Sequence, residues 1–280
     1  MSLRIITDST ADITPAMAQA MNVSIVPLKV LFGTQEYRDG IDLSIEDFYK
    51  KLTSSDQLPT TSQPSPNDFL VEFEQAKQAG DEVLVLCLSS ELSGTYQSAV
   101  LAKNVCEYDA IHIVDTLQAT IGTQILLNEA LRMRQAGSTA AQIAGRLNEL
   151  KHRVTILAVV DTLEYLVKGG RLSRAAGFAG SLLGIHPMIT LDQGKLVVLG
   201  KARGRKATLE LFRREMEKKG MPDLNFAPVF GYTGSAEAVS ELIEAMKQQG
   251  IESPYVCAVG SVIGTHTGPG VSAIAYLRQA

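Results

Sequence analysis

Residues 82–99 read EVLVLCLSSELSGTYQSA, an apolar run followed by a hydroxyl-rich turn and a second, helix-like run. Residues 82–88 are almost entirely apolar, which is typical of a strand buried on both faces of a sheet. Residues 95–105 are expected to form a helix, and Ser93 is placed to cap it. A buried strand that runs through a hydroxyl-rich turn into a helix predicts a parallel sheet covered by helices.

The same alternation of strands and helices continues on both sides of this stretch. Strands are expected at residues 4–8 and 111–115, and residues 23–32 are rich in β-formers. Helices are expected at residues 14–21, 45–52, 66–79, 119–135 and 139–153, where Pro15 and Gly80 act as start and stop signals. This pattern indicates an α/β fold whose N-terminal part is a mostly parallel, three-layer α/β/α domain.

The second half of the chain has a different pattern. Residues 187–191 and 195–199 flank Asp192-Gln193-Gly194, which is a good hairpin turn. Further strands are expected at residues 154–160, 226–231 and 255–262, and helices at residues 162–167, 208–219 and 237–248. Hairpins mixed with helices indicate a two-layer α+β domain with a mixed sheet. We therefore divide the chain into domains 1–152 and 153–280.

Composition argues against several classes of protein. The 280 residues carry a net charge of -4, which does not suit a general nucleic-acid binder. No apolar run approaches the ~20 residues of a membrane span, and we expect no secretory signal at residues 1–8, because they reach the acidic Asp8 too early. Cys87, Cys106 and Cys257 form no CxxC pair, so we expect neither a disulfide framework nor a metal site. We therefore expect a protein of the reducing cytoplasm.

Hydroxyl side chains gather where strands are expected to end. Asp8-Ser9-Thr10, residues 89–94 and Asp115-Thr116 each follow an expected strand. Ligands of open parallel sheets bind outside the carboxyl ends of the strands, and helix N-termini attract anions. Residues 89–94 thus predict an anion site, although Ser93 acting only as a helix cap explains the same pattern.

Residues 58–66 read LPTTSQPSP, and three prolines exclude a helix interior or a central strand. Thr60, Thr61 and Ser62 are therefore expected on a stiff loop rich in hydrogen-bond donors. An ordinary surface loop with a helix cap at Ser65 is the alternative. The functional interpretation rests on hydroxyl residues recurring on several separate loops.

Residues 260–270 read GSVIGTHTGPG and follow an expected strand. Their glycines predict a loop that can approach a ligand closely, with His266 between Thr265 and Thr267. His266 could donate to an oxyanion or titrate near neutrality. His112 and His152 are interpreted as structural, and both interpretations stay open for His186.

Basic residues cluster at residues 168–174 and 201–206. Such residues pair with phosphates or with acidic partner surfaces, and a solvated face is the alternative. The chain lacks the phosphate-binding motifs GxxxxGK[ST] and GxGxxG. It also lacks a G-x-S-x-G elbow and a cysteine beside a histidine, so no nucleophile–base pair stands out.

Taken together, these stretches resemble the DegV family of bacterial fatty acid-binding proteins. The resemblance covers about residues 4–279 and rests on five motifs in order, which are far more specific together than singly. They are DSTAD (residues 8–12), TTSQPS (60–65), SSELSGTYQSA (89–99), LEYLVKGGRLS (163–173) and GTHTGPG (264–270). One position departs from the family, because many members have a lysine where this chain has His186 before Pro187.

The resemblance implies a long-chain fatty acid, such as palmitate, stearate or oleate, held between two domains, with no cofactor and no metal. Its tail would run into the second domain. From physical reasoning we expect hydroxyls, rather than an arginine clamp, to hold the carboxylate. Carried over residue by residue, the contacts are Thr61 and Ser93, with Ser62, Gly94, His266 and Thr267 as neighbours.

The resemblance also implies a partner. Some family members are the lipid-presenting subunit of fatty acid kinase, in which a separate kinase subunit makes an acyl phosphate on the bound lipid. In that scheme Arg171, Arg203 and Arg205 are expected to form a docking surface. The chain itself would then be a carrier for lipid transport and fatty acid metabolism rather than an enzyme, with at most transient contact with a membrane surface.

Two other functions stay open at this point. The first is a stand-alone hydrolase or phosphotransferase that uses His266 and an aspartate at a strand end. The aspartates in question are Asp8, Asp12, Asp115 and Asp161. The second is a regulatory or scaffold module whose lipid is only a structural filler.

Overall fold

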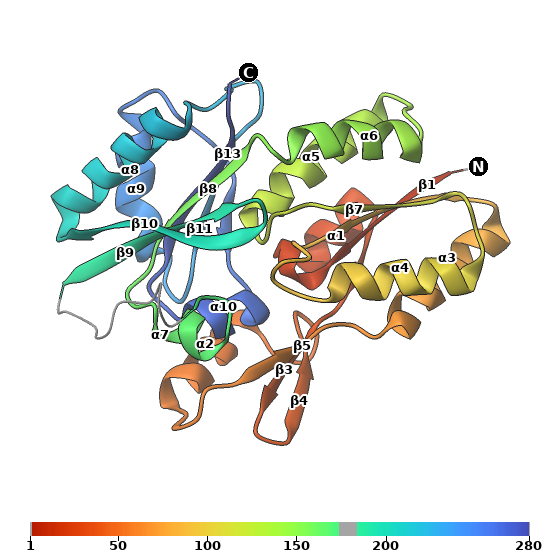
Figure 1. Cartoon of the computed structure of the whole chain (residues 1–280), viewed down its shortest axis with the longest axis horizontal. Coiled ribbons are helices and arrows are strands. Elements are labelled where there is room, and N and C mark those ends of the chain that lie inside the picture. Colours follow the sequence, from red (N-terminus) through yellow and green to blue (C-terminus); the bar gives the residue numbers. More distant parts are fainter. Residues whose placement is uncertain (1, 174–183, 280) are drawn as a thin grey trace.

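The computed structural model describes residues 2–173 and 184–279 and arranges them around three β-sheets (Figure 1). The first sheet has the strand order β2-β1-β6-β7, and all its pairs are parallel. Its strands are β1 (Leu3–Asp8), β2 (Val23–Val26), β6 (Glu82–Cys87) and β7 (Ile111–Asp115). The expected strands at 82–88 and 111–115 are confirmed.

Helices cover both faces of this parallel sheet. Val83 and Val85 of β6 pack with Phe69 and Phe73, whereas Leu84 packs in the core on the opposite face. One face carries α3 (Pro66–Ala79) and α4 (Thr95–Cys106), and the other carries α1 (Pro15–Met21), α5 (Ile121–Gln135) and α6 (Ala140–Leu150). Alternate side chains of a strand point to opposite faces, so an apolar run such as β6 needs two covering layers. The three-layer prediction is confirmed.

The second sheet is mixed and has the order β10-β9-β8-β13-β11-β12. Its strands are β8 (Val154–Val159), β9 (Ile185–Asp192), β10 (Lys195–Arg203), β11 (Val229–Tyr232), β12 (Val256–Ala258) and β13 (Ser272–Leu277). One face packs on α8 (Arg205–Lys219) and α9 (Glu237–Lys247), and the other faces α5. The expected α+β architecture and the hairpin turn, in which Gln193 and Gly194 have φ of 47° and 81°, are both present.

The third sheet was not expected from the sequence. It consists of β3 (Lys29–Phe32), β4 (Gln35–Arg38) and β5 (Thr60–Ser62), with α2 (Ile45–Ser54) packed nearby. The prediction of a loop for Thr60–Ser62 is therefore wrong. The flanking prolines exclude a central strand, but β5 lies at the edge of its sheet, where neighbouring prolines are tolerated.

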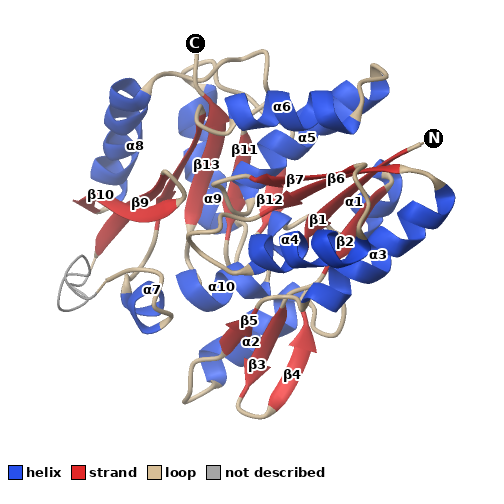
Figure 2. Cartoon of the chain, turned by 45° about the vertical axis from the view of Figure 1, so that its right-hand side comes forward, coloured by secondary structure: helices blue, strands red, loops and turns tan. Residues whose placement is uncertain are grey.

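The glycine-rich segment near the C-terminus is also not the predicted loop. Ser261–Thr267 form helix α10, which lies between the six-stranded sheet and the small sheet (Figure 2). Its first N–H groups are capped from the other half of the chain. The Gly260 N–H donates to Asp12 Oδ1 at 3.0 Å, and the Ser261 N–H donates to Asp39 Oδ1 at 3.2 Å. These long-range caps stabilise a helix that local glycine content disfavours.

A third correction concerns the start of α4. The structure places Gly94, not Ser93, at the N-cap position, and the Ser93 hydroxyl lies 3.0 Å from Thr95 Oγ1. The Ser93 hydroxyl also accepts from the Thr95 N–H at 3.4 Å, so it bonds the first N–H of the helix from one residue before the N-cap. The division into domains 1–152 and 153–280 stays a prediction, and α10 packs across it, because Val262 contacts the core around Val30 and Phe48.

In the described residues, the three cysteines are free and buried, and no group of side chains could hold a metal ion. No helix of the described ranges is long and apolar enough to cross a bilayer. Arg174, at the end of the first basic cluster, lies outside the described residues.

Candidate functional site

A cavity of about 320 Å³ lies where the three sheets meet. This volume falls within the ~300–1,000 Å³ typical of small-molecule sites. Its walls are mainly aliphatic, with contributions from α5, β8, β9, β10 and β13 and from the turn after β6. Leu88, Ile121, Ile156, Ile189 and Leu196 are examples. A long apolar ligand would therefore be surrounded by hydrocarbon on most of its surface.

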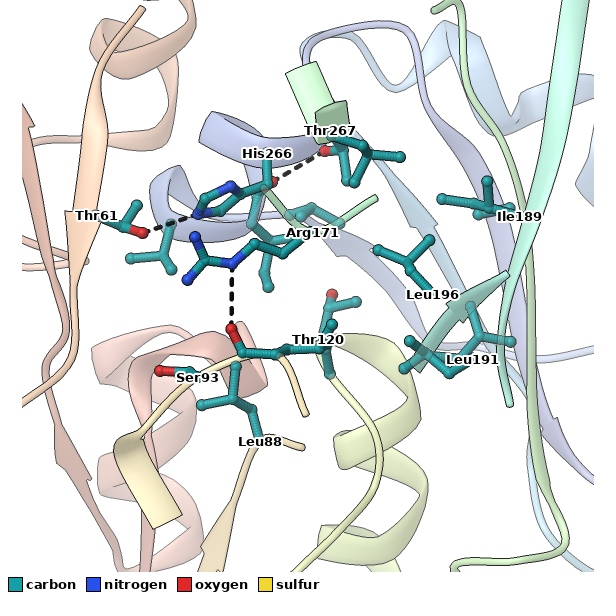
Figure 3. Close-up of a pocket in the computed structure, with 18 of the residues that line it drawn as sticks. Thr61, Leu88, Ser93, Thr120, Arg171, Ile189, Leu191, Leu196, His266 and Thr267 are labelled. Atoms are coloured by element: carbon teal, nitrogen blue, oxygen red, sulfur yellow. Dashed lines mark hydrogen bonds between the residues drawn. The ribbon is translucent and has the colours of Figure 1, made fainter. Parts of the chain in front are cut away.

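Polar side chains gather at one end of this cavity. Figure 3 shows Thr61 and His266 together, with Arg171 between them and Ser93. All six residues that the sequence predicted for the ligand line this cavity. They are Thr61, Ser62, Ser93, Gly94, His266 and Thr267. Residues from β5, the start of α4 and α10 thus meet although they are far apart in the sequence.

Thr61 and His266 are joined by a hydrogen bond of 2.8 Å between Oγ1 and Nε2. Burial and the charge of Arg171 lower the pKa of His266 to about 4, so the imidazole is neutral near pH 7. Its Nδ1 is buried and has no hydrogen-bond partner in the described residues. Because a bare acceptor is tolerated better than an unpaired N–H, we assign the proton to Nε2. Thr61 then accepts from His266, and its own hydroxyl hydrogen can point to a ligand.

The lowered pKa of His266 gives a prediction for stability. Between pH 6.5 and about 4 the folded chain binds fewer protons at His266 than the unfolded chain does. The stabilisation is therefore complete above pH 6.5 and is lost as the pH falls through 4, by about 3 kcal/mol in all. Urea unfolding should show this fall relative to His266→Gln. The pKa of Asp8, raised by burial to about 6, acts in the opposite direction in both proteins and cancels in the difference.

An NMR titration of the histidine ring protons checks the same prediction directly. The resonance that His266→Gln removes should titrate near pH 4 in the ligand-free protein. Titration of that resonance near 6.5, the ordinary histidine value, would contradict the neutral, buried imidazole described above.

Arg171 adds a cation to the cavity, although we expected this residue on a docking surface. Its Nε donates to Leu92 O at 3.1 Å and its Nη1 to Gly169 O at 2.8 Å. Partial burial lowers its pKa, but a guanidinium stays charged at neutral pH. A guanidinium has five N–H groups, which is more than these two carbonyls use. Arg171 thus lies in the cavity wall, although its expected role was on a docking surface.

The side chain of Gln63 approaches Gly94 closely, which the sequence did not reveal. A Cβ atom at this position would lie 2.1 Å from Oε1 of Gln63. Gln63 itself donates from Nε2 to Ser98 Oγ at 3.0 Å and lines the cavity. The side chain of Gln63 therefore crosses the start of α4. Its place in the motif TTSQPS was the only signal that could have found it.

Three buried aspartates hold the backbone around the site. Asp8 accepts from the Leu88 N–H at 2.7 Å, while Asp12 and Asp39 cap α10. Burial raises the pKa of all three, and the charge of Asp39 adds to the rise at Asp12. No carboxylate in residues 2–173 and 184–279 is hydrogen-bonded to His266. Asp39 was not singled out from the sequence, where it is one acid among many.

The other predicted basic residues lie apart from the cavity. Arg203 and Arg205 line a surface depression at the start of α8, together with Lys206 and Arg213. Arg205 pairs with Glu241 at 2.8 Å. Their role in docking stays a prediction. His186 lies at the start of β9, with Nδ1 at 3.2 Å from Asp161 Oδ1.

Comparison with known proteins identifies close relatives. Residues 2–279 match the family model described as "Uncharacterised protein, DegV family". A fatty acid-binding protein of Thermotoga maritima is 34% identical over 277 residues, which are 96% of each chain. A fatty acid-binding DegV protein of Thermus thermophilus has a TM-score of 0.88 at 32% identity, covering 99% of this chain and 100% of that one. A stearic acid-binding protein of Eubacterium ventriosum has a TM-score of 0.89 at 27% identity, covering 99% and 98%.

Proposed function

This chain belongs to the DegV family, and on that basis we propose that it binds a long-chain fatty acid in the cavity between its sheets. The observation that carries the proposal is the division of the cavity into an aliphatic body and one polar end. A fatty acid has the same division. The stearic acid and fatty acids named for the similar structures support this ligand class.

The aliphatic walls would supply most of the affinity. Each buried methylene contributes about 0.8 kcal/mol, so roughly fourteen give about 11 kcal/mol before ordering and association costs of several kcal/mol. Ile121, Ile156 and Leu196 lie along this part of the cavity. Palmitate, stearate and oleate are all long enough to use such walls.

The polar end would hold the carboxylate. Thr61 can donate its hydroxyl hydrogen because His266 donates to its oxygen, and Ser93 supplies a second hydroxyl. The start of α4 at Gly94 favours an anion, because the positive end of a helix dipole lies at the N-terminus. Arg171 adds a full positive charge beside them. Ser62 and Thr267 also line the cavity, as do Thr120, Thr190 and Thr233.

The geometry favours a carrier over a stand-alone enzyme. A histidine base needs a carboxylate or carbonyl that orients it, and His266 Nδ1 has no partner in the described part of the chain. Its pKa of about 4 also makes it a weak base at neutral pH. The buried aspartates are directed at backbone N–H groups instead. We therefore propose that catalysis on the bound lipid is supplied by a partner.

We further propose that this partner is a cytoplasmic fatty acid kinase subunit that makes an acyl phosphate, or that the protein transports the lipid. Arg203 and Arg205 are exposed at the start of α8, where Arg205 also pairs with Glu241, and an acidic surface of the partner would meet them there. Exchange of radiolabelled palmitate into the folded protein separates a carrier from a structural filler. A lipid that leaves only on unfolding would contradict the carrier proposal.

Replacing the two hydroxyls tests the proposed head-group site. Thr61→Val and Ser93→Ala should each weaken palmitate binding about 10- to 100-fold, the value of a hydrogen bond to a charged group. Thr60→Val is the matched control, because Thr60 lies on the same strand but is exposed and outside the cavity. Equal affinities for the wild type, Thr61→Val and Ser93→Ala, measured by calorimetry, would refute the head-group assignment.

A further inference from the structure

In the turn between β9 and β10, Gly194 is packed against the first half of the chain, whereas Asp192, Gln193 and Lys195 are exposed, as hairpin turns usually are. We call residues 192–195 the hairpin tip. Within it, Gly194 is buried, and its carbonyl accepts a hydrogen bond of 2.9 Å from Ser89 Oγ. Lys195 Nζ lies 3.5 Å from Glu91 Oε2. The hairpin tip is therefore held on the turn that follows β6.

Gly194 of the hairpin tip is packed so closely that it leaves no room for a side chain. A Cβ atom on Gly194 would lie 2.4 Å from Ser89 Oγ and 3.2 Å from Leu117 Cδ2. Gly194 also has a φ of 81°, which the turn requires. Ser89 is fully buried and also accepts from the Glu91 N–H at 3.3 Å. The position of the tip is thus fixed by a buried hydrogen bond and by close packing.

Two leucines stand directly behind the hairpin tip. Leu191 and Leu196 are opposite each other in the β9–β10 ladder, and both line the cavity. Figure 3 shows them on the far side of the cavity from Thr61 and Ser93. They therefore lie where the methyl end of a ligand anchored at the polar end would arrive.

The space beyond these leucines is unsuited to hydrocarbon. A second cavity of about 210 Å³ is lined by Lys151, Asp192 and Gly194, and Leu191 borders both cavities. Its surface is almost entirely polar, so a methyl group that passed Leu191 would lose its apolar contacts. Leu191 is thus the boundary between an apolar and a polar space.

We propose that Leu191 and Leu196, fixed in place by the docked hairpin tip, form the end wall that sets the longest acyl chain the protein accepts. This inference rests on the proposed function. Below the limit, each added methylene tightens binding about fourfold, because it is buried among aliphatic groups. Above the limit, the chain must bend or enter the polar cavity, and affinity falls.

Dissociation constants for saturated fatty acids of increasing length test the end wall. Leu191→Ala should move the point of tightest binding to chains longer by about two carbons, because it removes side-chain volume from the wall. Leu196→Phe should move it to shorter chains. Ser89→Ala leaves both leucines in place but frees the hairpin tip, so affinity should fall less steeply beyond the limit.

Val197→Ala is the matched control for these variants. Val197 lies between Leu196 and Val198 on β10, is 36% exposed and does not line the cavity. It should leave the length profile unchanged.

Profiles for Leu191→Ala and Leu196→Phe that match the wild type would overturn the end wall while leaving fatty acid binding intact. If circular dichroism shows that Leu191→Ala does not fold, the length profile of Leu196→Phe alone tests the end wall. A wild type that binds no fatty acid of any length would instead refute the proposed function, and the end wall with it.

Discussion

Gly169→Ala is expected to weaken fatty acid binding by roughly 100-fold, or ~2.7 kcal/mol. A Cβ atom at Gly169 would lie 2.3 Å from Nδ1 of His266 and 3.0 Å from the carbonyl oxygen of Tyr165. The carbonyl belongs to the backbone, so the imidazole must move. Its 2.8 Å bond to Thr61 would then break, and Thr61 would no longer be oriented toward the carboxylate. One methyl group thus disturbs the polar end without removing any polar atom.

The effect of Gly169→Ala cannot arise from backbone strain. Gly169 ends α7 (Glu164–Lys168) with a φ of -75°, which alanine adopts freely. Gly145→Ala is the matched control, because a Cβ atom at Gly145 meets nothing within 4 Å. That control should bind palmitate as the wild type does. Wild-type affinity in Gly169→Ala, with a shifted or unshifted melting temperature, would show that His266 does not orient the carboxylate site.

Arg171→Met is expected to weaken palmitate binding about 10- to 100-fold, because it removes the cation from the polar end of the cavity. Methionine keeps much of the side-chain length but cannot attract a carboxylate. The sharper readout is the comparison with hexadecanol, which has the same chain without the charge. Arg171→Met should reduce palmitate affinity strongly and hexadecanol affinity little. Equal losses for both ligands would indicate that Arg171 acts only through its bonds to Leu92 O and Gly169 O.

Arg205→Met is the matched control for Arg171→Met and also tests the two predicted roles of the basic residues. Arg205 lies outside the cavity, so its loss should leave palmitate binding unchanged. With a kinase partner present, Arg205→Met should instead slow phosphorylation of lipid that is already bound. Loss of palmitate affinity in Arg205→Met would contradict the separation of the cavity from the basic surface.

The parts of the fold that local signals determine were predictable from the sequence. Helix α3 begins at Pro66 and is followed by Gly80, as proline at a first helical position and glycine past a last one indicate. The run 82–88 indicated burial on both faces, and Val83 and Leu84 of β6 do pack into opposite cores. These signals lie within a few residues of what they determine.

The parts that long-range contacts determine were not predictable. Helix α10 depends on caps from Asp12 and Asp39, which are more than two hundred residues away in the chain. Strand β5 forms because Thr61 pairs with Val30 of β3, in a small sheet that the local sequence pattern did not predict. Both wrongly predicted segments, Thr60–Ser62 and Ser261–Thr267, carry residues of the candidate site. Their hydroxyls and imidazole were recognised by type and motif, but their supporting structure was not.

The sequence also could not separate cavity walls from ordinary core. Ile121 and Ile156 are aliphatic residues in regular elements, and only the structure shows that they border a space. The position of Arg171 was equally hard to predict, because the sequence of a basic cluster does not show which of its side chains points into the cavity. Packing between sheets makes both distinctions, and packing depends on the whole chain.

Native mass spectrometry of the purified protein, repeated after extraction with organic solvent, tests directly whether the cavity holds a fatty acid. We expect a discrete added mass that matches a long-chain fatty acid and disappears on extraction. The extracted protein should then take up added palmitate at one molecule per chain. A protein that carries no lipid and takes up neither palmitate nor oleate would contradict the claim that this cavity binds a fatty acid.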